Sequence, residues 1–141
     1  MEKVVASGKA RAIGVANYSV QYLEELLPHV SIVPAVNQIE NHPLLPQQEI
    51  VDFCDRKGIH VTAYSPLGSS GSPLIQLPVI NAVAERRSAT PALILINWHS
   101  TLKQTPFGVH AASGSHPCVL RLHEKIVACL ENGKTNWLLL T

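Results

Sequence analysis

Residues 12–16 read Ala-Ile-Gly-Val-Ala, and this apolar run decides the fold class predicted for the chain. The run lies between Gly8-Lys9 and Asn17-Tyr18-Ser19, residue types that are typical of turns. Because the run is apolar without alternation, it predicts a strand buried on both faces, as in a parallel sheet covered by helices. The first expectation is therefore an α/β protein with a parallel sheet.

A helix and a second strand are predicted directly after this first strand. Ser19 is expected to cap the helix, and Pro28 is expected to end it. The apolar residues of the predicted helix share one face, namely Val20, Leu23, Leu26 and Leu27. The second strand is predicted over residues 33–39, with Pro34 near its start, where a missing N–H is tolerated.

A third strand–helix unit completes the regular part of the sequence. Pro46 is expected to open a helix whose apolar stripe includes Phe53 and Cys54, so that Cys54 is interpreted as a core residue. Gly58 is expected to end this helix, and a strand is predicted over residues 59–64. Repeats of this length indicate right-handed βαβ units and a parallel sheet.

The alternation of predicted strands and helices ends after residue 64. Residues 65–73 are rich in serine and glycine and are predicted to form a loop, and two helical stretches are expected at residues 77–87 and 91–100. No regular alternation of strands and helices follows. We therefore expect two parts: residues 1–100 and a divergent tail over residues 101–141.

The composition excludes several classes of function. Eleven basic and ten acidic residues give a net charge of +1 without a large basic cluster, which does not favour nucleic-acid binding or an anionic membrane surface. The apolar runs are too short to span a bilayer, and no signal peptide is recognised. Three cysteines are too few, and odd in number, for a disulfide framework. We expect a cytoplasmic protein.

Polar side chains stand at the ends of the three predicted strands. Asn17 follows the first strand, Gln38 lies near the end of the second, and Tyr64 ends the third. The C-terminal ends of parallel strands share one rim, which is where barrels place their active sites. Amides match a carboxamide such as nicotinamide, and a tyrosine ring offers a flat surface for a planar heterocycle. The alternative, that these residues only cap strands and anchor loops, stays open here.

The loop after Tyr64 adds hydroxyl groups to this rim. Ser65 and Ser69, together with backbone N–H groups exposed by neighbouring glycines, are a plausible cradle for phosphate.

Three long motifs resemble those of the aldo-keto reductases, in the family's order and spacing. They are residues 8–19 (Gly-Lys-Ala-Arg-Ala-Ile-Gly-Val-Ala-Asn-Tyr-Ser), 34–43 (Pro-Ala-Val-Asn-Gln-Ile-Glu-Asn-His-Pro) and 61–69 (Val-Thr-Ala-Tyr-Ser-Pro-Leu-Gly-Ser). Residues 91–98 also resemble the helix before the family's last barrel strand. The resemblance covers residues 1 to about 100. It implies a partial (β/α)8 TIM barrel over residues 1–100, with about three βα units, and NADPH-dependent reduction of small carbonyl compounds.

The resemblance also implies residue roles. Asn17 and Gln38 would hold the nicotinamide carboxamide, and Tyr64 would stack beneath the ring. Ser65, Leu67 and Ser69 would hold the pyrophosphate of NADP, the leucine through its backbone. The family usually has serine before the asparagine, where this chain has Ala16. One hydrogen bond, worth about 0.5–1.5 kcal/mol, is expected to be missing.

The family's four catalytic residues come from strands that would precede Met1, so no catalytic residue is assigned here. Met1 to Val5 resembles the inside of the helix before the family's fifth strand. We therefore expect a truncated reductase that is inactive as this chain and binds NADP weakly or not at all. The alternative is a non-catalytic half-barrel that associates with itself or with another protein through open sheet edges.

Other candidate signals are set aside. The residues His110, His116, Cys118 and His123 lack the ligand spacing of a zinc site, so no metal is predicted. Residues 128–135 fit only a relaxed phosphate-loop pattern, with too little chain after it for the required helix. His42 is interpreted as structuring a proline turn, and Trp98 as a packing residue.

Overall fold

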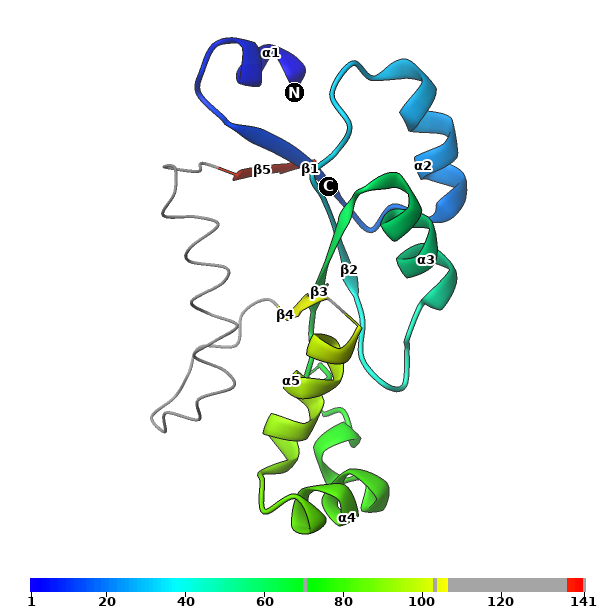
Figure 1. Ribbon diagram of the computed structural model, residues 1–141, viewed down its shortest axis with the longest axis vertical. Helices are drawn as coiled ribbons and strands as arrows, with labels where there is room; N and C mark the ends of the chain where they lie inside the picture. Colours follow the sequence, from blue (N-terminus) through cyan, green and yellow to red (C-terminus); the bar gives the residue numbers. More distant parts are fainter. Residues whose placement is uncertain (70, 103, 107–136, 141) are drawn as a thin grey trace.

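A parallel five-stranded sheet forms the centre of the protein. A computed structural model describes residues 1–69, 71–102, 104–106 and 137–140 (Figure 1). The strands are β1 (Ala12–Ala16), β2 (Val36–Glu40), β3 (His60–Tyr64), β4 (Thr105–Pro106) and β5 (Trp137–Leu140). All neighbours are parallel, in the order β4-β3-β2-β1-β5. The predicted partial barrel of three parallel strand–helix units is confirmed.

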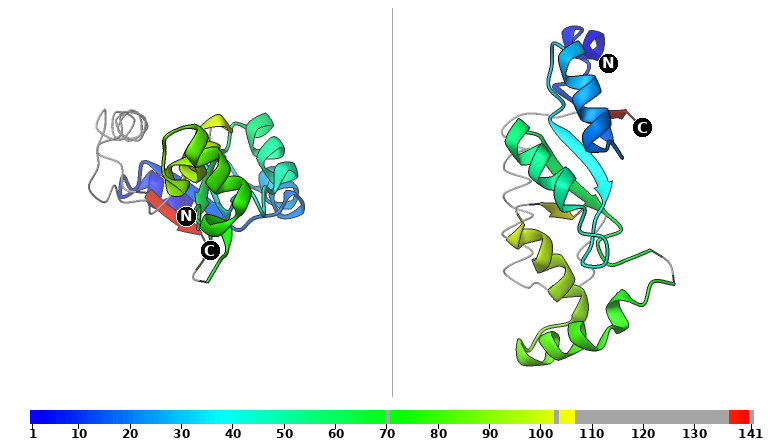
Figure 2. Two further views of the ribbon diagram at one scale, coloured as in Figure 1. Left: turned by 90° about the horizontal axis from the view of Figure 1, so that it is seen from below. Right: turned by 90° about the vertical axis from the view of Figure 1, so that its right-hand side faces the viewer.

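Helices lie along one side of this sheet and beyond its end. They are α1 (Glu2–Ala6), α2 (Val20–Leu26), η1 (Leu27–His29), α3 (Gln48–Lys57), η2 (Leu74–Gln76), α4 (Pro78–Arg86) and α5 (Pro91–Thr101). Figures 1 and 2 show α2 and α3 side by side against the sheet, with the α4–α5 pair beyond its lower end. The helices predicted at residues 77–87 and 91–100 are confirmed.

Two strands occur where no strand was predicted. The sequence after residue 100 shows no regular pattern, but β4 pairs with β3 and β5 pairs with β1. β1 is therefore an inner strand of the sheet, not the open edge expected from the sequence. Short strands carry little periodic signal, because two to four residues cannot establish an alternation.

One proline agrees with the prediction and one differs from it. The α-helix α2 ends at Leu26, just before Pro28, which lies in the 3-10 turn η1 that follows. Pro46 precedes α3 by two residues, and Gln47 adopts a left-handed conformation with φ of 42° between them. The Asn41 side chain donates to the Pro46 carbonyl over 2.7 Å, which holds Pro46 in the turn before the helix.

The main core joins the sheet to α2 and α3. Val15, Ile39 and Val61 of the three long strands pack against Leu23 of α2 and Cys54 of α3. Leu23 and Cys54 have no exposed surface, which confirms the apolar stripes predicted for both helices. Full burial of a side chain such as Leu23 contributes about 1.5–3 kcal/mol to folding.

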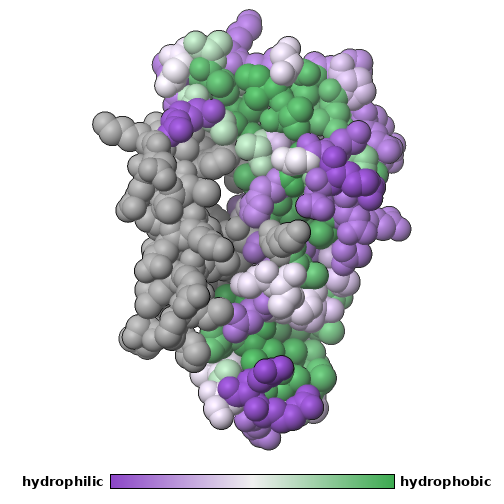
Figure 3. All heavy atoms as spheres, viewed as in Figure 1, coloured by the Kyte–Doolittle hydropathy of each residue, from purple (hydrophilic) through white to green (hydrophobic). Residues whose placement is uncertain are grey.

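A second, smaller core lies under the loop that follows β3. Leu74 of η2, Ile80 of α4 and Leu95 of α5 are buried against one another. Figure 3 shows hydrophobic surface near both ends of the molecule in this view. A recess of about 370 Å³ is lined by residues that include Met1, Ile13 and Leu26. Among the described residues, no helix has the length and apolar character needed to cross a lipid bilayer.

One buried amide ties the first two strand–helix units together. Asn37 of β2 has no exposed surface and points to the helix side of the sheet. Its Nδ2 donates to the Tyr18 carbonyl over 2.9 Å, and its Oδ1 accepts from the Tyr18 N–H over 3.3 Å. The turn between β1 and α2 is thereby fixed to the neighbouring strand, where the backbone would otherwise lack partners.

We predict that Asn37→Ala lowers the free energy of unfolding by about 2–4 kcal/mol. The substitution removes both hydrogen bonds to Tyr18, leaves buried backbone groups unpaired and opens a cavity. Urea unfolding followed by circular dichroism measures the loss. Gln21→Ala on the exposed face of α2 is the matched control and should cost less than about 0.5 kcal/mol. An equal effect for both variants would contradict the role of Asn37.

Candidate functional site

The three polar residues predicted at the rim lie at the ends of adjacent parallel strands. Ala16 pairs with Gln38 in β2, and the Asn17 N–H donates to the Gln38 carbonyl over 2.8 Å. On the other side Glu40 pairs with Tyr64, the last residue of β3. The structure therefore brings Asn17, Gln38 and Tyr64 to the C-terminal rim of the sheet.

The pleat of the sheet decides which way two of these side chains point. Ile39 and Val61 belong to the core under the helices, so their neighbours along the strands point to the opposite face. Gln38 and Tyr64 therefore stand on the face turned away from α2 and α3, which corresponds to the inside of a closed barrel. Both side chains are half-buried.

Asn17 reaches the rim through an unusual backbone conformation. Its φ of 59° lies in the left-handed region, which asparagine tolerates better than most residues. Its side chain is exposed. Neither the Asn17 nor the Gln38 side-chain amide hydrogen-bonds another part of the described chain. Both amides are thus available to a ligand at the rim.

Backbone hydrogen bonds within the loop after β3 stabilise its sharp turns. Ser65 has φ of 50°, and its carbonyl accepts from the Gly68 N–H over 2.8 Å. The Ser69 carbonyl accepts from the Ser72 N–H over 2.9 Å. The Leu67 side chain packs against the second core, whereas Ser69 is exposed. The three residues predicted to contact phosphate thus lie on one compact turn next to Tyr64.

Gly68 is the position in this turn that tolerates no side chain. Its φ is 86°, and a Cβ atom there would lie 2.3 Å from the Ser72 hydroxyl oxygen. Gly71 has a similar φ of 82°, but a Cβ atom there would meet nothing within 4 Å. Alanine substitution at the two glycines therefore distinguishes the cost of a positive φ from the cost of a steric clash.

We predict that Gly68→Ala destabilises the protein more than Gly71→Ala. Both variants place alanine at a positive φ, at a cost of about 1–3 kcal/mol, but only Gly68→Ala also pushes Ser72 from its place. Chemical denaturation of the two variants measures the difference directly. Equal losses of stability would show that the contact with Ser72 does not constrain the loop.

A cluster of buried polar side chains lies near this loop, and sequence reasoning missed most of it. Asn41, His42, His99 and Gln104 are all buried. His42 Nε2 lies 3.6 Å from a Glu40 carboxylate oxygen, and His99 Nδ1 lies 3.2 Å from Gln104 Oε1. Burial lowers the pKa of His99 and is the largest influence on it. His99 is therefore neutral at neutral pH.

The cluster has structural partners in the chain around it. The His42 backbone exchanges hydrogen bonds with Leu45, 3.3 Å and 2.8 Å long, which agrees with the interpretation of His42 as a turn residue. Trp98 packs edge-to-face on His99, with ring centroids 4.9 Å apart. No periodic signal reveals His99, because it lies in the polar last turn of α5, after the apolar run Ala92 to Ile96. The polar pair Asn41-His42 beside Pro43 was the available hint.

The described part of the chain holds no group of three or more metal-binding side chains. The histidines and cysteine considered for zinc, from His110 to His123, lie outside the described residues.

A parallel sheet with polar residues gathered at its C-terminal rim is typical of α/β proteins, βα barrels among them. The sequence profile of the aldo/keto reductase family matches residues 1–73. The chain belongs to the aldo/keto reductase family.

Individual relatives agree with this assignment over the first part of the chain. The D-galacturonate reductase of Hypocrea jecorina is 60% identical over 99 residues, which cover 70% of this chain and 32% of that protein. The glycerol 2-dehydrogenase (NADP(+)) of Saccharomyces cerevisiae is 46% identical over 101 residues, with 70% and 32% covered. The chain thus spans about a third of the length of these curated relatives.

A solved structure shows the same fold. The aldose reductase from Schistosoma japonicum superimposes with a TM-score of 0.67 at 30% sequence identity, covering 89% of this chain and 44% of that one.

Proposed function

We propose that this chain is part of an oxidoreductase that reduces small carbonyl compounds with NADPH. The observation that carries the proposal is the common rim of Asn17, Gln38 and Tyr64, two available amides and an aromatic ring at the ends of adjacent parallel strands. Glycerol 2-dehydrogenase, one of the relatives, carries NADP(+) in its name. A cytoplasmic setting is part of the proposal, since three cysteines are few and odd in number for a disulfide framework.

The rim residues fit the reactive end of such a cofactor. The Asn17 and Gln38 amides each offer a donor and an acceptor, which complements a carboxamide. Tyr64 stands on the same sheet face as Gln38, so its ring forms a flat apolar surface beside the amide. When bound, NADPH supplies the hydride. The rim residues of this chain would orient the ring that carries it, with the Tyr64 ring against one of its faces.

The turn after β3 would hold the negatively charged part of the cofactor. Ser65 and Ser69 offer hydroxyl groups, and Leu67 offers its backbone while its side chain remains in the second core. Gly68 lets the backbone turn closely enough to bring these three residues together. Oriented N–H and hydroxyl groups on a tight turn are a recurrent phosphate site.

Ala16 is the one departure in this proposed site. It is buried at the end of β1, directly before Asn17. A hydroxyl at this position would add one hydrogen bond to the carboxamide, so the site as it stands should bind less tightly than one with serine. The lost bond corresponds to about 0.5–1.5 kcal/mol.

Reduction also requires a proton donor placed next to the carbonyl group. None of the residues that match the family's motifs in this chain takes that role, so the 141 residues alone are proposed to bind cofactor without turning over. The proposed substrates are small carbonyl compounds, the substrate class of the family as a whole.

We predict weak, localised binding of NADPH to the 141-residue chain. Fluorescence titration should give a dissociation constant above the micromolar range, and NMR shifts should centre on Asn17, Gln38 and Tyr64. Tyr64→Ala should abolish the binding, whereas Ala16→Ser should tighten it about 2- to 10-fold.

Gln21→Ala, on the exposed face of α2, is the control and should leave the titration unchanged. Shifts confined to another surface, or no binding at millimolar NADPH, would refute the cofactor site. Carbonyl reduction above background would refute the proposed lack of turnover.

A second proposal is a non-catalytic, self-associating half-barrel. Its support is the one-sided cover of the sheet: α2 and α3 pack against one face, and no described helix covers the face that carries Val36, Gln38 and Tyr64 (Figures 1 and 2). In a closed barrel that face is filled from the opposite wall. A second copy would supply such a wall.

We predict for this second function a discrete dimer in size-exclusion chromatography with light scattering. Gln38→Lys, which places a charge on the uncovered face, should shift the dimer towards monomer, whereas Gln21→Lys on the outer surface of α2 should not. A monomer that unfolds cooperatively would count against self-association and leave the first proposal standing.

A further inference from the structure

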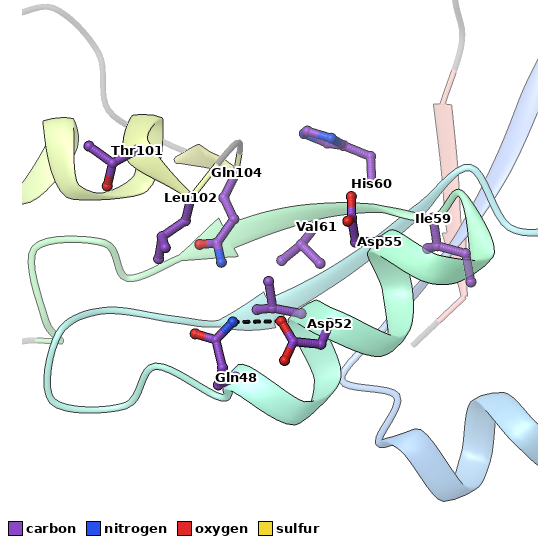
Figure 4. A pocket seen from close by; sticks show the side chains of 10 residues that line it. Gln48, Asp52, Asp55, Ile59, His60, Val61, Thr101, Leu102 and Gln104 are labelled. Atoms are coloured by element: carbon purple, nitrogen blue, oxygen red, sulfur yellow. Dashed lines mark hydrogen bonds between the residues drawn. The ribbon is translucent and has the colours of Figure 1, made fainter.

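A pocket lies on the helix side of the sheet, away from the proposed cofactor rim. It has a volume of about 230 Å³ and opens between α3, β3 and the turn from α5 to β4 (Figure 4). Val51, Val61 and Leu102 are among the residues that line it. This volume is below the roughly 300 Å³ at which sites for drug-sized ligands begin. The pocket therefore suits a group the size of one side chain.

Two carboxylates stand at one side of this pocket. Asp52 and Asp55 lie three residues apart on α3 and so share a helix face. Asp52 accepts a hydrogen bond from Gln48 over 2.7 Å. Within the described ranges, neither aspartate forms an ion pair.

The nearest basic residues of the same helix are directed elsewhere. The Arg56 guanidinium and the Lys57 ammonium lie 5.9 Å and 5.7 Å from the centre of the Phe53 ring. Neither residue lines the pocket. His60 also lines the pocket, but burial lowers its pKa, so it adds no positive charge beside the aspartates at neutral pH. The negative charge of Asp52 and Asp55 is therefore open to a cation from outside the described chain.

A buried hydrogen-bond donor faces the same space. Gln104 is 3% exposed, and its Oε1 is held by His99, but its Nε2 has no hydrogen-bond partner in the described part of the chain. Figure 4 shows its carboxamide directed from the segment before β4 towards α3, with Asp52 on the facing side. A buried donor without a partner is costly, so an acceptor from a ligand would be favoured.

The lining of the pocket therefore favours a small ligand with three properties. The carboxylates favour a positive charge, Gln104 Nε2 favours an acceptor oxygen, and the apolar floor of Val51, Val61 and Leu102 favours methylene groups. A lysine or arginine residue combines all three, because its aliphatic stem joins a cationic head to a backbone carbonyl.

We propose that this pocket binds a basic amino-acid residue, with its cationic group at Asp52 and Asp55 and its carbonyl oxygen at Gln104. Such a residue occurs as a free amino-acid derivative or within a peptide, and both present the same groups. The site is independent of the proposed cofactor function, because it shares none of the rim residues.

Three probes test the assignment on the full 141-residue chain by NMR titration. Nα-acetyl-lysine amide carries both the cation and the carbonyl, Nα-acetyl-norleucine amide lacks the cation, and n-butylamine lacks the carbonyl. We expect the lysine probe to bind tightest. Norleucine should bind more than about tenfold more weakly, and butylamine about 3- to 10-fold more weakly.

Variants assign each preference to its side chain. Asp52→Asn with Asp55→Asn should remove the preference for lysine over norleucine, whereas Glu49→Gln, on the same helix but outside the pocket, should keep it. Gln104→Met should remove the preference for lysine over butylamine. Circular dichroism checks that each variant is folded; should Gln104→Met fail this check, the aspartate pair and its Glu49 control decide the outcome.

Saturable binding of the lysine probe that depends on Asp52 and Asp55 supports the proposal. A blocked Gly-Lys-Gly peptide distinguishes the sources: tighter binding than the single residue indicates a peptide ligand, and equal binding indicates that one residue suffices. No saturable binding of any probe, or equal losses in the aspartate and Glu49 variants, would overturn it.

Discussion

The pairing of the Asn37 side chain with the Tyr18 backbone is the interaction on which the rest of this structure depends. Both backbone groups of Tyr18 lie in the turn that carries the chain from β1 to α2, and a side chain of the neighbouring strand satisfies them. Since Asn37 is fully buried, water cannot replace it without opening the core. The same turn sets the left-handed backbone of Asn17, so one amide under the sheet fixes the position of another amide on its rim.

The two faces of β2 show how a five-residue strand serves stability and binding together. Asn37 and Ile39 point to the helices, and Gln38 points the other way. A pleated strand turns alternate residues to opposite faces, so a shift of register by one residue would exchange these roles. The parallel pairing of β2 with β3 along its whole length holds that register.

Much of the regular architecture could be predicted from the sequence, because its signals are local. A continuous apolar run marked β1, and Gly58 marked the end of α3 through the left-handed conformation that it adopts. The rim of Asn17, Gln38 and Tyr64 followed from the rule that parallel strands end together. The cluster around His99 and Gln104 could not be found in this way, because its members come from separate segments and meet only after folding. The prediction that Pro46 opens a helix was wrong, because a hydrogen bond from the Asn41 side chain holds Pro46 in the turn before α3.

The parallel pairing of β1 with β5 has a consequence for the order of folding. Ala12 pairs with Trp137, near the opposite end of the chain, whereas β1, β2 and β3 join segments that follow one another closely. Contacts between distant residues are slow to form, because the entropy of closing a long loop is lost before the contact is gained. The three long strands and their two helices can therefore assemble before β5 arrives, and β1 passes through an interval in which its outer hydrogen-bonding groups meet only solvent.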